Sequence, residues 1–259
     1  MNSLKIVTFN FRCQWATELD GINSGIHRLG SIINKIDDEK PDVIAFQEIT
    51  QESLSMLERV LPDYIFVGLL RNADYTGEGV FTALKKDTIH LIGLDTFWIS
   101  PTPHTPATRF EGQSQFSRVC CSVTIRHKAS GERMRIYNIH LDHIGDLARI
   151  EGIKCVMNIA KEDMQKSKLP LVLLGDFNAY PDSETIQFCD SYKDIPLFDV
   201  TKDIKTTFHN FGTEDNCKID YIYVSEELNK KVENAEIWDN VHSGIYLSDH
   251  YPVAMELVF

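Results

Sequence analysis

Two polar residues stand at the end of an apolar run in the second half of the chain. The segment "LLGDFNAYPDS" (173–183) leads from apolar residues directly into Asp176 and Asn178. In an extended chain, residues two apart project from the same face, so both side chains would point together from the end of a buried strand. A turn is the simpler explanation, because Gly, Asp, Asn and Pro are the common turn formers.

Polar side chains end or interrupt other apolar runs in a similar way. The runs and their polar residues are "IVTFN" with Asn10, "DVIAFQE" with Gln47 and Glu48, "NIHLDH" with His140 and Asp142, "KIDYIYV" with Asp220, and "LSDHYPV" with Asp249 and His250. Each segment alone fits a capped turn or a satisfied polar group. A buried carboxylate without a partner is costly, so acids at several core margins should be paired or should hold a cation. Together the segments favour a functional site.

The donor types indicate a hard divalent cation. Glu, Asp and Asn offer oxygen ligands, which Mg²⁺ and Mn²⁺ prefer. The chain contains no HExxH motif and no CxxC pair, so a zinc site is not expected. We expect Glu48 to anchor Mg²⁺, or Mn²⁺, with Asn10 and Asp249 beside it.

The remaining polar residues suit hydrolysis of a phosphate ester. That reaction needs a Lewis acid on the phosphoryl oxygens, a group that activates or aligns water, and donors for the developing charge. An Asp220–His250 pair could take a proton from water. Asp176 and Asn178 could hold the water and the transition-state oxygen, and His140 could assist a non-bridging oxygen or the leaving group.

Motifs of other enzyme classes are missing. The sequence has no Walker loop, no GxSxG elbow and no GxGxxG, which argues against kinases, serine hydrolases and dinucleotide-binding enzymes. The net charge of −12 disfavours a protein that grips long duplex DNA, because such proteins neutralise phosphates with Lys and Arg.

Composition sets the expected class and location. The 259 residues are 43% hydrophobic and contain no linker-like or repetitive tract, which favours a single domain over residues 1–259. No apolar run approaches the roughly 20 residues of a membrane helix. A strand-like run begins at Leu4 without a signal-peptide pattern, and several of the six cysteines lie in apolar runs. We expect a cytoplasmic protein with reduced thiols and no membrane contact.

Strand-like segments greatly outnumber helical ones. The strand-like segments are 4–11, 42–49, 64–70, 79–84, 89–99, 119–127, 133–141, 169–175, 218–225, 232–238 and 250–259, and the helical ones are 25–38, 50–60, 145–167 and 183–191. This pattern predicts two mainly antiparallel or mixed sheets packed face to face, with helices outside. Residues 100–118 are expected to form a long surface loop.

The ordered set of motifs resembles the endonuclease/exonuclease/phosphatase superfamily, whose fold is DNase I-like. The matching segments are "TFN" (8–10), "FQE" (46–48), "NIHLDH" (138–143), "GDFN" (175–178), "IDYI" (219–222) and "SDH" (248–250). The resemblance implies an α/β fold, a four-layered α/β/β/α sandwich, and a metal-dependent phosphoesterase. It gives the polar residues above the same roles that their chemistry suggests.

A closer resemblance is to the bacterial branch that is similar to eukaryotic mRNA deadenylases and nocturnin. The segments that match this branch are "TGE" (76–78), "DTFWISPTP" (95–103), "NIHLDH" and "TFHNFG" (207–212). This resemblance implies that Glu78 orients His140 and that Arg118 and Arg71 contact the substrate. The chain departs from the branch at 71–74, which reads "RNAD", and at 111–118, which reads "EGQSQFSR".

The leading hypothesis is a Mg²⁺-dependent phosphoesterase that hydrolyses a phosphate mono- or diester. Its substrate would be a small phosphorylated metabolite, a nucleotide or a short single-stranded RNA. The alternatives are a secreted-type nuclease or sphingomyelinase-like phosphodiesterase, and a non-catalytic module that binds a phosphorylated ligand. The sequence does not define the oligomeric state.

Overall fold

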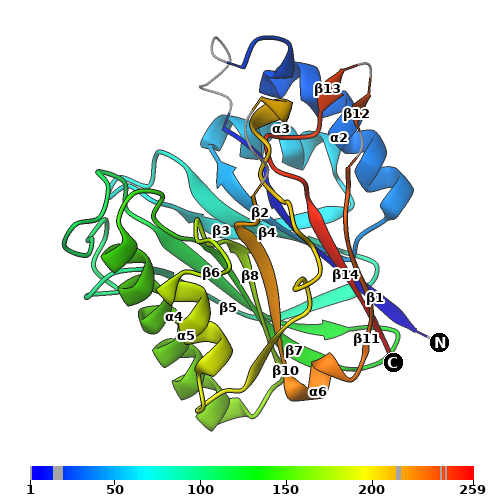
Figure 1. The fold of residues 1–259 in the computed structure, drawn as a ribbon. Coiled ribbons are helices and arrows are strands. Elements are labelled where there is room, and N and C mark those ends of the chain that lie inside the picture. Colours follow the sequence, from blue (N-terminus) through cyan, green and yellow to red (C-terminus); the bar gives the residue numbers. More distant parts are fainter. Residues whose placement is uncertain (1, 14–19, 214–216, 240, 243) are drawn as a thin grey trace.

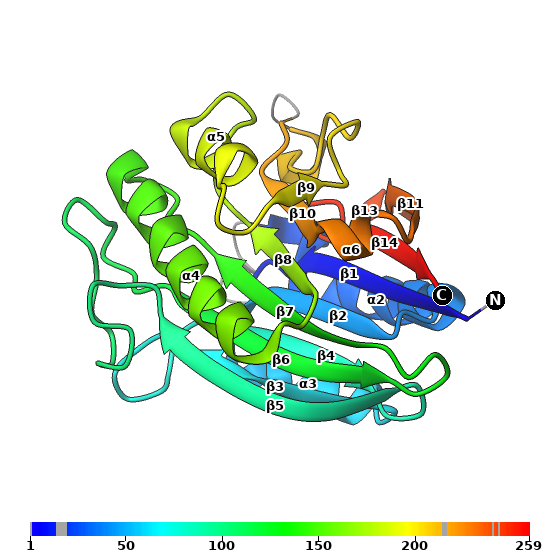
Figure 2. The same cartoon turned by 90° about the horizontal axis from the view of Figure 1, so that it is seen from below.

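Two six-stranded sheets pack face to face, with helices on their outer faces (Figures 1 and 2). The computed structural model describes residues 2–13, 20–213, 217–239, 241–242 and 244–259. The predicted α/β sandwich of two mixed sheets is therefore confirmed.

The first sheet joins the two ends of the chain. Its strand order is β11-β14-β1-β2-β4-β3. β1 and β2 are parallel, and the other neighbours are antiparallel. The strands are β1 (Ser3–Asn10), β2 (Val43–Ile49), β3 (Tyr64–Leu70), β4 (Gly79–Lys85), β11 (Val232–Ile237) and β14 (Val253–Val258).

The second sheet is formed by the middle of the chain, in the order β5-β6-β7-β8-β10-β9. β7 and β8 are its one parallel pair. Its strands are β5 (Ile89–Trp98), β6 (Val119–His127), β7 (Arg133–His140), β8 (Leu171–Asp176), β9 (Leu197–Asp199) and β10 (Asp220–Ser225). A separate small hairpin consists of β12 (Val241–His242) and β13 (Ile245–Tyr246).

The helices cover the outer faces of the two sheets. α2 (Gly25–Glu39) and α3 (Gln51–Val60) lie on the first sheet, and α4 (Asp146–Ser167) and α5 (Glu184–Ser191) lie on the second (Figure 2). A short helix, α6 (Glu226–Asn229), follows β10. None of the helices in the described part of the chain is both long and apolar enough to cross a bilayer.

The central strands, such as β2 and β8, read as continuous apolar runs because both of their faces are buried. In β1, Leu4 and Ile6 belong to the apolar layer between the sheets, whereas Val7 and Phe9 pack in the layer beneath α2 and α3. This burial on both faces fixes each strand's orientation, because a one-residue shift would move every side chain to the other face.

One polar contact crosses the apolar layer between the sheets. The side-chain amide of Gln47 donates to Asn138 Oδ1 at 2.8 Å, and Asn138 Nδ2 donates to the carbonyl oxygens of Phe46 and Phe81 at 3.1 Å each. Both side chains are fully buried. Gln47 and Asn138 therefore tie β2 to β7 just below the strand ends that carry the polar residues.

Candidate active site

Strand register aligns three of the predicted residues on the second sheet. His140 lies opposite Asp176 in the parallel pair β7–β8, and Asp220 lies opposite Asp176 in the antiparallel pair β8–β10. His140 and Asp176 end their strands, and Asp220 begins its strand. The three side chains therefore stand at one edge of the sheet.

Gly175 lets β8 approach β7 closely enough to place Asp176. Its φ is +141°, and a Cβ atom at this position would lie 2.0 Å from the carbonyl oxygen of Ile139. Only glycine fits there without a shift of the backbone. Beyond the strand, Asn178 has a φ of +48° and donates its backbone N–H to Asp176 Oδ1 at 2.8 Å. Asp176 and Asn178 thus form a turn and also line a pocket.

A bulge in β2 directs Glu48 away from the sheet. The register of β2 with β4 shifts between Phe46 and Ile49, and Glu48 has a φ of +59°. Bulges of this kind redirect a side chain, often beside an active site. Gln47 consequently points between the sheets while Glu48 lines the pocket.

Asn10 links the two sheets at this edge. It ends β1, and its Nδ2 donates to Glu48 Oε1 at 3.1 Å and to Asp176 Oδ2 at 3.0 Å. Its Oδ1 accepts the backbone N–H of Arg12 at 3.0 Å. The three residues expected to hold the cation therefore belong to the first sheet: Asn10 ends β1, Glu48 lies in β2 and Asp249 lies just before β14. Asp249 Oδ2 lies 3.4 Å from Arg12 Nη1.

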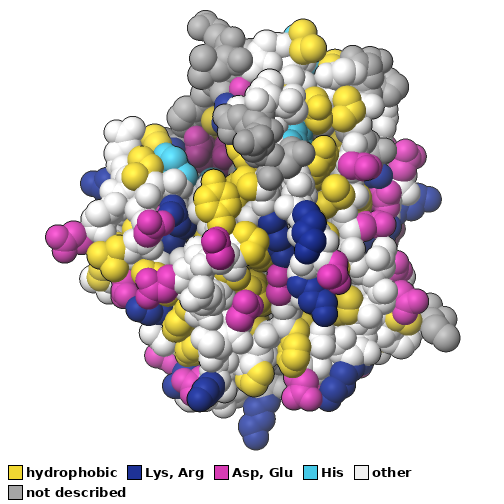
Figure 3. All heavy atoms as spheres, in the orientation of Figure 1, with side chains coloured by type: hydrophobic (Ala, Val, Ile, Leu, Met, Phe, Trp, Pro, Cys, Tyr) yellow, Lys and Arg dark blue, Asp and Glu magenta, His cyan; other side chains and the backbone are white. Residues whose placement is uncertain are grey.

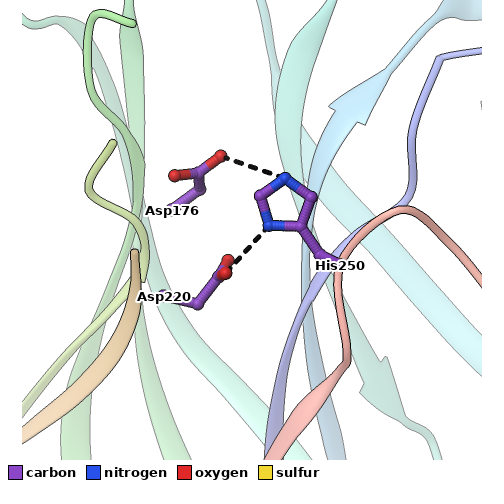
Figure 4. Close-up of side chains that lie close together, drawn as sticks. All are labelled: Asp176, Asp220 and His250. Carbon is purple, nitrogen blue, oxygen red and sulfur yellow. Dashed lines mark hydrogen bonds and ion pairs between the residues drawn. The ribbon is translucent and has the colours of Figure 1, made fainter. Parts of the chain in front are cut away.

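Asp220 and His250 form the expected pair (Figure 4). Asp220 Oδ2 lies 2.8 Å from His250 Nδ1, and the other ring nitrogen, Nε2, lies 3.9 Å from Asp176 Oδ2. The carboxylates extend from β8 and β10, whereas the imidazole comes from the segment before β14. All three side chains are buried.

Buried charges shift the pKa values of this cluster. Burial alone would lower the pKa of His250, but the adjacent Asp220, with Asp176 and Asp249, raises it to about 10. Burial and the charge of Asp220 raise the pKa of Asp176 to about 7. Burial also raises the pKa of Asp249, and the charge of Glu48 adds to that rise. Burial is the largest cause of the raised pKa of both acids, and a positive charge bound beside them would oppose it.

The donors present suit a divalent cation. Asp176, Asp220 and His250 place one ligand atom each within 4.8 Å of one another, a spacing compatible with a metal ion. In that group, however, the Asp220 contact already occupies His250 Nδ1. Glu48 is half-buried and Asp249 is buried, and the charges of the two carboxylates repel. The amide of Asn10 lies beside them, with Nδ2 donating to Glu48 and Oδ1 accepting the Arg12 backbone N–H. This oxygen-rich set matches the preference of Mg²⁺ and Mn²⁺.

The pocket over these residues has a volume of about 460 Å³. Most of the predicted site residues line it: Glu48, Arg71, Glu78, Arg118, His140, Asp176, Asn178, Asp249 and His250. Asn10 and Asp220 lie directly behind, bonded to Asp176 and His250 respectively. The structure thus brings all the predicted side chains together, while their individual roles stay predictions.

Glu78 forms its ion pair with an arginine. Its Oε2 lies 2.5 Å from Arg71 Nη1. Burial, followed by the charge of Glu48, raises the pKa of Glu78. Among the hydrogen bonds of the described residues, none joins Glu78 to His140, whose Nε2 instead lies 3.4 Å from Asp176 Oδ2. The orienting role expected for Glu78 stays a prediction.

Sequence reasoning missed several pocket residues. Arg12, Phe116, His143, Arg149 and Tyr180 also line the pocket. Two of them had a local signal: Arg12 follows "TFN" by two residues, and His143 closes the "NIHLDH" segment. Arg149 and Tyr180 had none, because a helical arginine and a loop tyrosine are common on any surface.

Known proteins share this architecture. A crystal structure of an endonuclease/exonuclease/phosphatase from Bacteroides vulgatus has a TM-score of 0.90 and 25% identity, covering 100% of this chain and 99% of that chain. A mannosyl-6-phosphatase from Bacteroides thetaiotaomicron has a TM-score of 0.86 and 24% identity, covering 99% and 100%. The human nocturnin catalytic domain, with bound sulfate anion, has a TM-score of 0.74 and 18% identity, covering 99% and 93%.

The sequence itself also matches a family model. The model described as the Endonuclease/Exonuclease/phosphatase family aligns with residues 7–250, which include every predicted site residue. The resemblance inferred from the motifs is confirmed. The chain belongs to the endonuclease/exonuclease/phosphatase family of phosphate-ester hydrolases.

Proposed function

We propose that this protein hydrolyses a phosphate ester of a small molecule or a short single-stranded nucleic acid, with Mg²⁺ or Mn²⁺ as cofactor. The observation that best supports the proposal is the placement of His250 between Asp220, 2.8 Å from its Nδ1, and Asp176, 3.9 Å from its Nε2. An imidazole oriented by one carboxylate and facing another is suited to activating water.

The cation would be held by Glu48 and Asp249, with Asn10 beside them. When bound, it supplies Lewis-acid polarisation of a phosphoryl oxygen. The proton affinity of His250 falls when positive charge binds beside these acids, which leaves Nε2 free to accept a proton.

The protein side chains perform the proton transfer. A water held between Asp176 and His250 attacks phosphorus and gives its proton to His250 Nε2, while Asp220 stabilises the imidazolium. The bond from phosphorus to the leaving oxygen breaks with its electron pair passing to that oxygen, which takes up a proton from solvent and leaves as the alcohol. Burial, together with Arg118 and Arg71, lowers the pKa of His140 well below its usual value, so its neutral imidazole can donate a hydrogen bond to a phosphoryl oxygen.

The charge of the protein supports a small substrate, and its free thiols support a cytoplasmic location. On the face shown in Figure 3, Lys and Arg side chains form separate groups among Asp and Glu. That distribution, with the net charge of −12, suits small or short substrates better than long duplex DNA. The thiols of Cys120, Cys121, Cys155 and Cys189 are not disulfide-bonded, which supports a cytoplasmic setting.

A colorimetric assay tests the proposal. The wild type and the variants Asp176→Asn and His250→Ala would be assayed on p-nitrophenyl phosphate and bis-p-nitrophenyl phosphate with Mg²⁺ or Mn²⁺. Each variant should lose about 10³-fold or more in kcat, because such groups act as a unit. Asp194→Asn is the matched control, since that side chain is 52% exposed and pairs with Lys161, and neither residue lines the pocket. Equal rates in all four proteins would overturn the proposal.

A further inference from the structure

Two nearly buried arginines form one part of the pocket wall. Arg71 and Arg118 are each only 5% exposed, and both line the pocket. Arg71 is held by Glu78 and by the ring of Phe116, whose centroid lies 4.2 Å from the guanidinium carbon. Arg118 is held through Nη2, which donates to His143 Nδ1 at 2.8 Å. Both guanidinium groups are therefore fixed before any ligand binds.

These arginines retain unused donors. The Nε atoms of Arg71 and Arg118 are buried and have no hydrogen-bond partner among the described residues. The nearest carboxylate to Arg118 Nε is Asp142 Oδ2, at 3.7 Å. The carboxylate of Asp142 already accepts bonds from the backbone and side chain of Ser114 and from two further backbone N–H groups. Each guanidinium group therefore has more N–H donors than its protein partners use, and both side chains line the pocket.

His143 adds a third donor to the same wall. Arginine can only donate, so Nδ1 of His143 must be the acceptor in the Arg118 contact. The ring is consequently neutral and carries its proton on Nε2. Because His143 lines the pocket, it offers a hydrogen bond and no charge of its own.

The arginines and carboxylates that line the pocket balance in number, so a bound divalent cation would favour a doubly charged ligand. Four arginines line it (Arg12, Arg71, Arg118 and Arg149), and four carboxylates offset them (Glu48, Glu78, Asp176 and Asp249). A bound divalent cation would add two positive charges. A phosphate monoester carries close to two negative charges at neutral pH, whereas a diester carries one. A monoester also presents three terminal oxygens to the donors and a diester only two.

We propose that the substrate of this site is a phosphate monoester dianion whose terminal oxygens are received by Arg118, Arg71 and His143. This inference rests on the proposed hydrolytic function and goes beyond it, because that function alone does not separate monoesters from diesters.

The test compares matched esters. The wild type should hydrolyse p-nitrophenyl phosphate with a kcat/KM about 100-fold or more above that for bis-p-nitrophenyl phosphate, since buried donors left unpaired penalise the wrong ligand. Arg118→Ala should lower kcat/KM for the monoester by about 10²–10³-fold and change the diester value much less. Arg126 is an exposed arginine on β6, the strand that follows Arg118 directly; Arg126→Ala is the control and should change neither value.

The outcomes separate this inference from the proposed function. If Asp176→Asn abolishes both activities while the wild type hydrolyses the diester as well as the monoester, the function stands and the monoester assignment is overturned. If Asp176→Asn leaves both activities intact, the proposed function itself fails. Equal losses on both esters in Arg118→Ala would also overturn the assignment.

A binding measurement keeps the inference testable if Arg118→Ala does not fold. Inorganic phosphate and dimethyl phosphate, a diester monoanion, would be compared as inhibitors of the wild type and of Arg118→Lys. The inhibition constant of inorganic phosphate for the wild type should be at least about tenfold lower than that of dimethyl phosphate. In Arg118→Lys the two inhibition constants should lie closer together, because lysine lacks the planar guanidinium group that can donate two parallel hydrogen bonds. Equal inhibition of the wild type by the two anions would overturn the proposal.

Discussion

The hydroxyl of Thr207 accepts the backbone N–H of Asp220 at 3.0 Å. The same hydroxyl accepts the N–H of Ile219 at 3.0 Å, and the Thr207 carbonyl oxygen accepts the N–H of Tyr251 at 2.6 Å. One buried threonine therefore holds both segments of the Asp220–His250 pair. We infer that Thr207 is a positioning residue, since the pair is formed by two segments that are distant in sequence.

Replacing Thr207 by Val should separate positioning from catalysis. The two backbone N–H groups lose their acceptor, so unfolding free energy should fall by about 1–3 kcal/mol. A small displacement of the pair should lower kcat by about 10- to 100-fold with little change in KM. Thr207→Ser retains the hydroxyl and should restore most of kcat. Steady-state kinetics and thermal melts check this, and an unchanged kcat in Thr207→Val would refute the positioning role.

Divalent cations should stabilise the protein through Glu48. A cation at 100 times its Kd adds about 2.7 kcal/mol to the unfolding free energy. We therefore expect Mn²⁺ to raise the Tm of the wild type and of the exposed-site control Asp194→Asn. Glu48→Gln should lose most of this response. The Tm is measured by calorimetry. If Mn²⁺ raised the Tm of Glu48→Gln as much as that of the wild type, the ion would not bind at Glu48.

Gly175 should tolerate no side chain. A Cβ there would lie 2.0 Å from the Ile139 carbonyl oxygen, so Gly175→Ala must push β8 from β7. We expect a loss of at least about 1–3 kcal/mol in denaturant unfolding, together with a loss of activity. Gly30→Ala is the control, and the opposite effect on stability is expected for it. It lies in α2, nothing lies within 4 Å of its Cβ position, and it should stabilise by about 0.5–1 kcal/mol. Equal stability of Gly175→Ala and wild type would contradict the close approach.

Gln47 and Asn138 should be energetically coupled across the two sheets. Their 2.8 Å bond is fully buried. Gln47→Ala removes the donor to Asn138 Oδ1, and Asn138→Ala removes one of the three acceptors of Gln47 Nε2. A double-mutant cycle with Gln47→Ala and Asn138→Ala should give a coupling free energy of about 0.5–3 kcal/mol. Urea unfolding of the four proteins measures it. Additive effects would show that the contact does not hold the sheets together.

Buried thiols should resist alkylation. Burial raises the pKa of Cys120, Cys121 and Cys189, that of Cys121 to about 12. Because the thiolate is the reactive form, iodoacetamide at pH 8 should leave these three unmodified in the native protein and modify them in urea. Mass spectrometry of peptides reads the result. The same raised pKa values mean that stability declines as pH rises above the unfolded thiol value of about 8.5.

Long elements were predictable because several consecutive residues are enough to show an apolar run or a period in the sequence. The segments 64–70 and 119–127 match β3 and β6 at both ends, and 145–167 matches α4 to within one residue. β9, β12, β13 and α6 were missed. Each has two to four residues, too few for periodicity to appear, and each is defined by neighbours that the sequence does not reveal.

The membership of the site was predictable, whereas its geometry was not. Acids, amides and histidines at strand ends signalled Asn10, Glu48, Asp176, Asp220 and His250. The left-handed backbone of Glu48, by contrast, is set by the bulge opposite β4, since nothing in a glutamate favours a φ of +59°. The Glu78–Arg71 pair likewise depends on a tertiary contact that the "TGE" motif does not specify.

The pairing of β14 with β1 makes the site depend on two segments that are distant in sequence. Asn10 ends β1, whereas Asp249 and His250 lie just before β14, which pairs with β1 from Ser3 to Thr8. The segment with Asp249 and His250 is thus anchored beside Asn10 by this pairing. We therefore expect a proteolytic cut before β14 to separate the two halves of the site while all of its side chains remain in the chain.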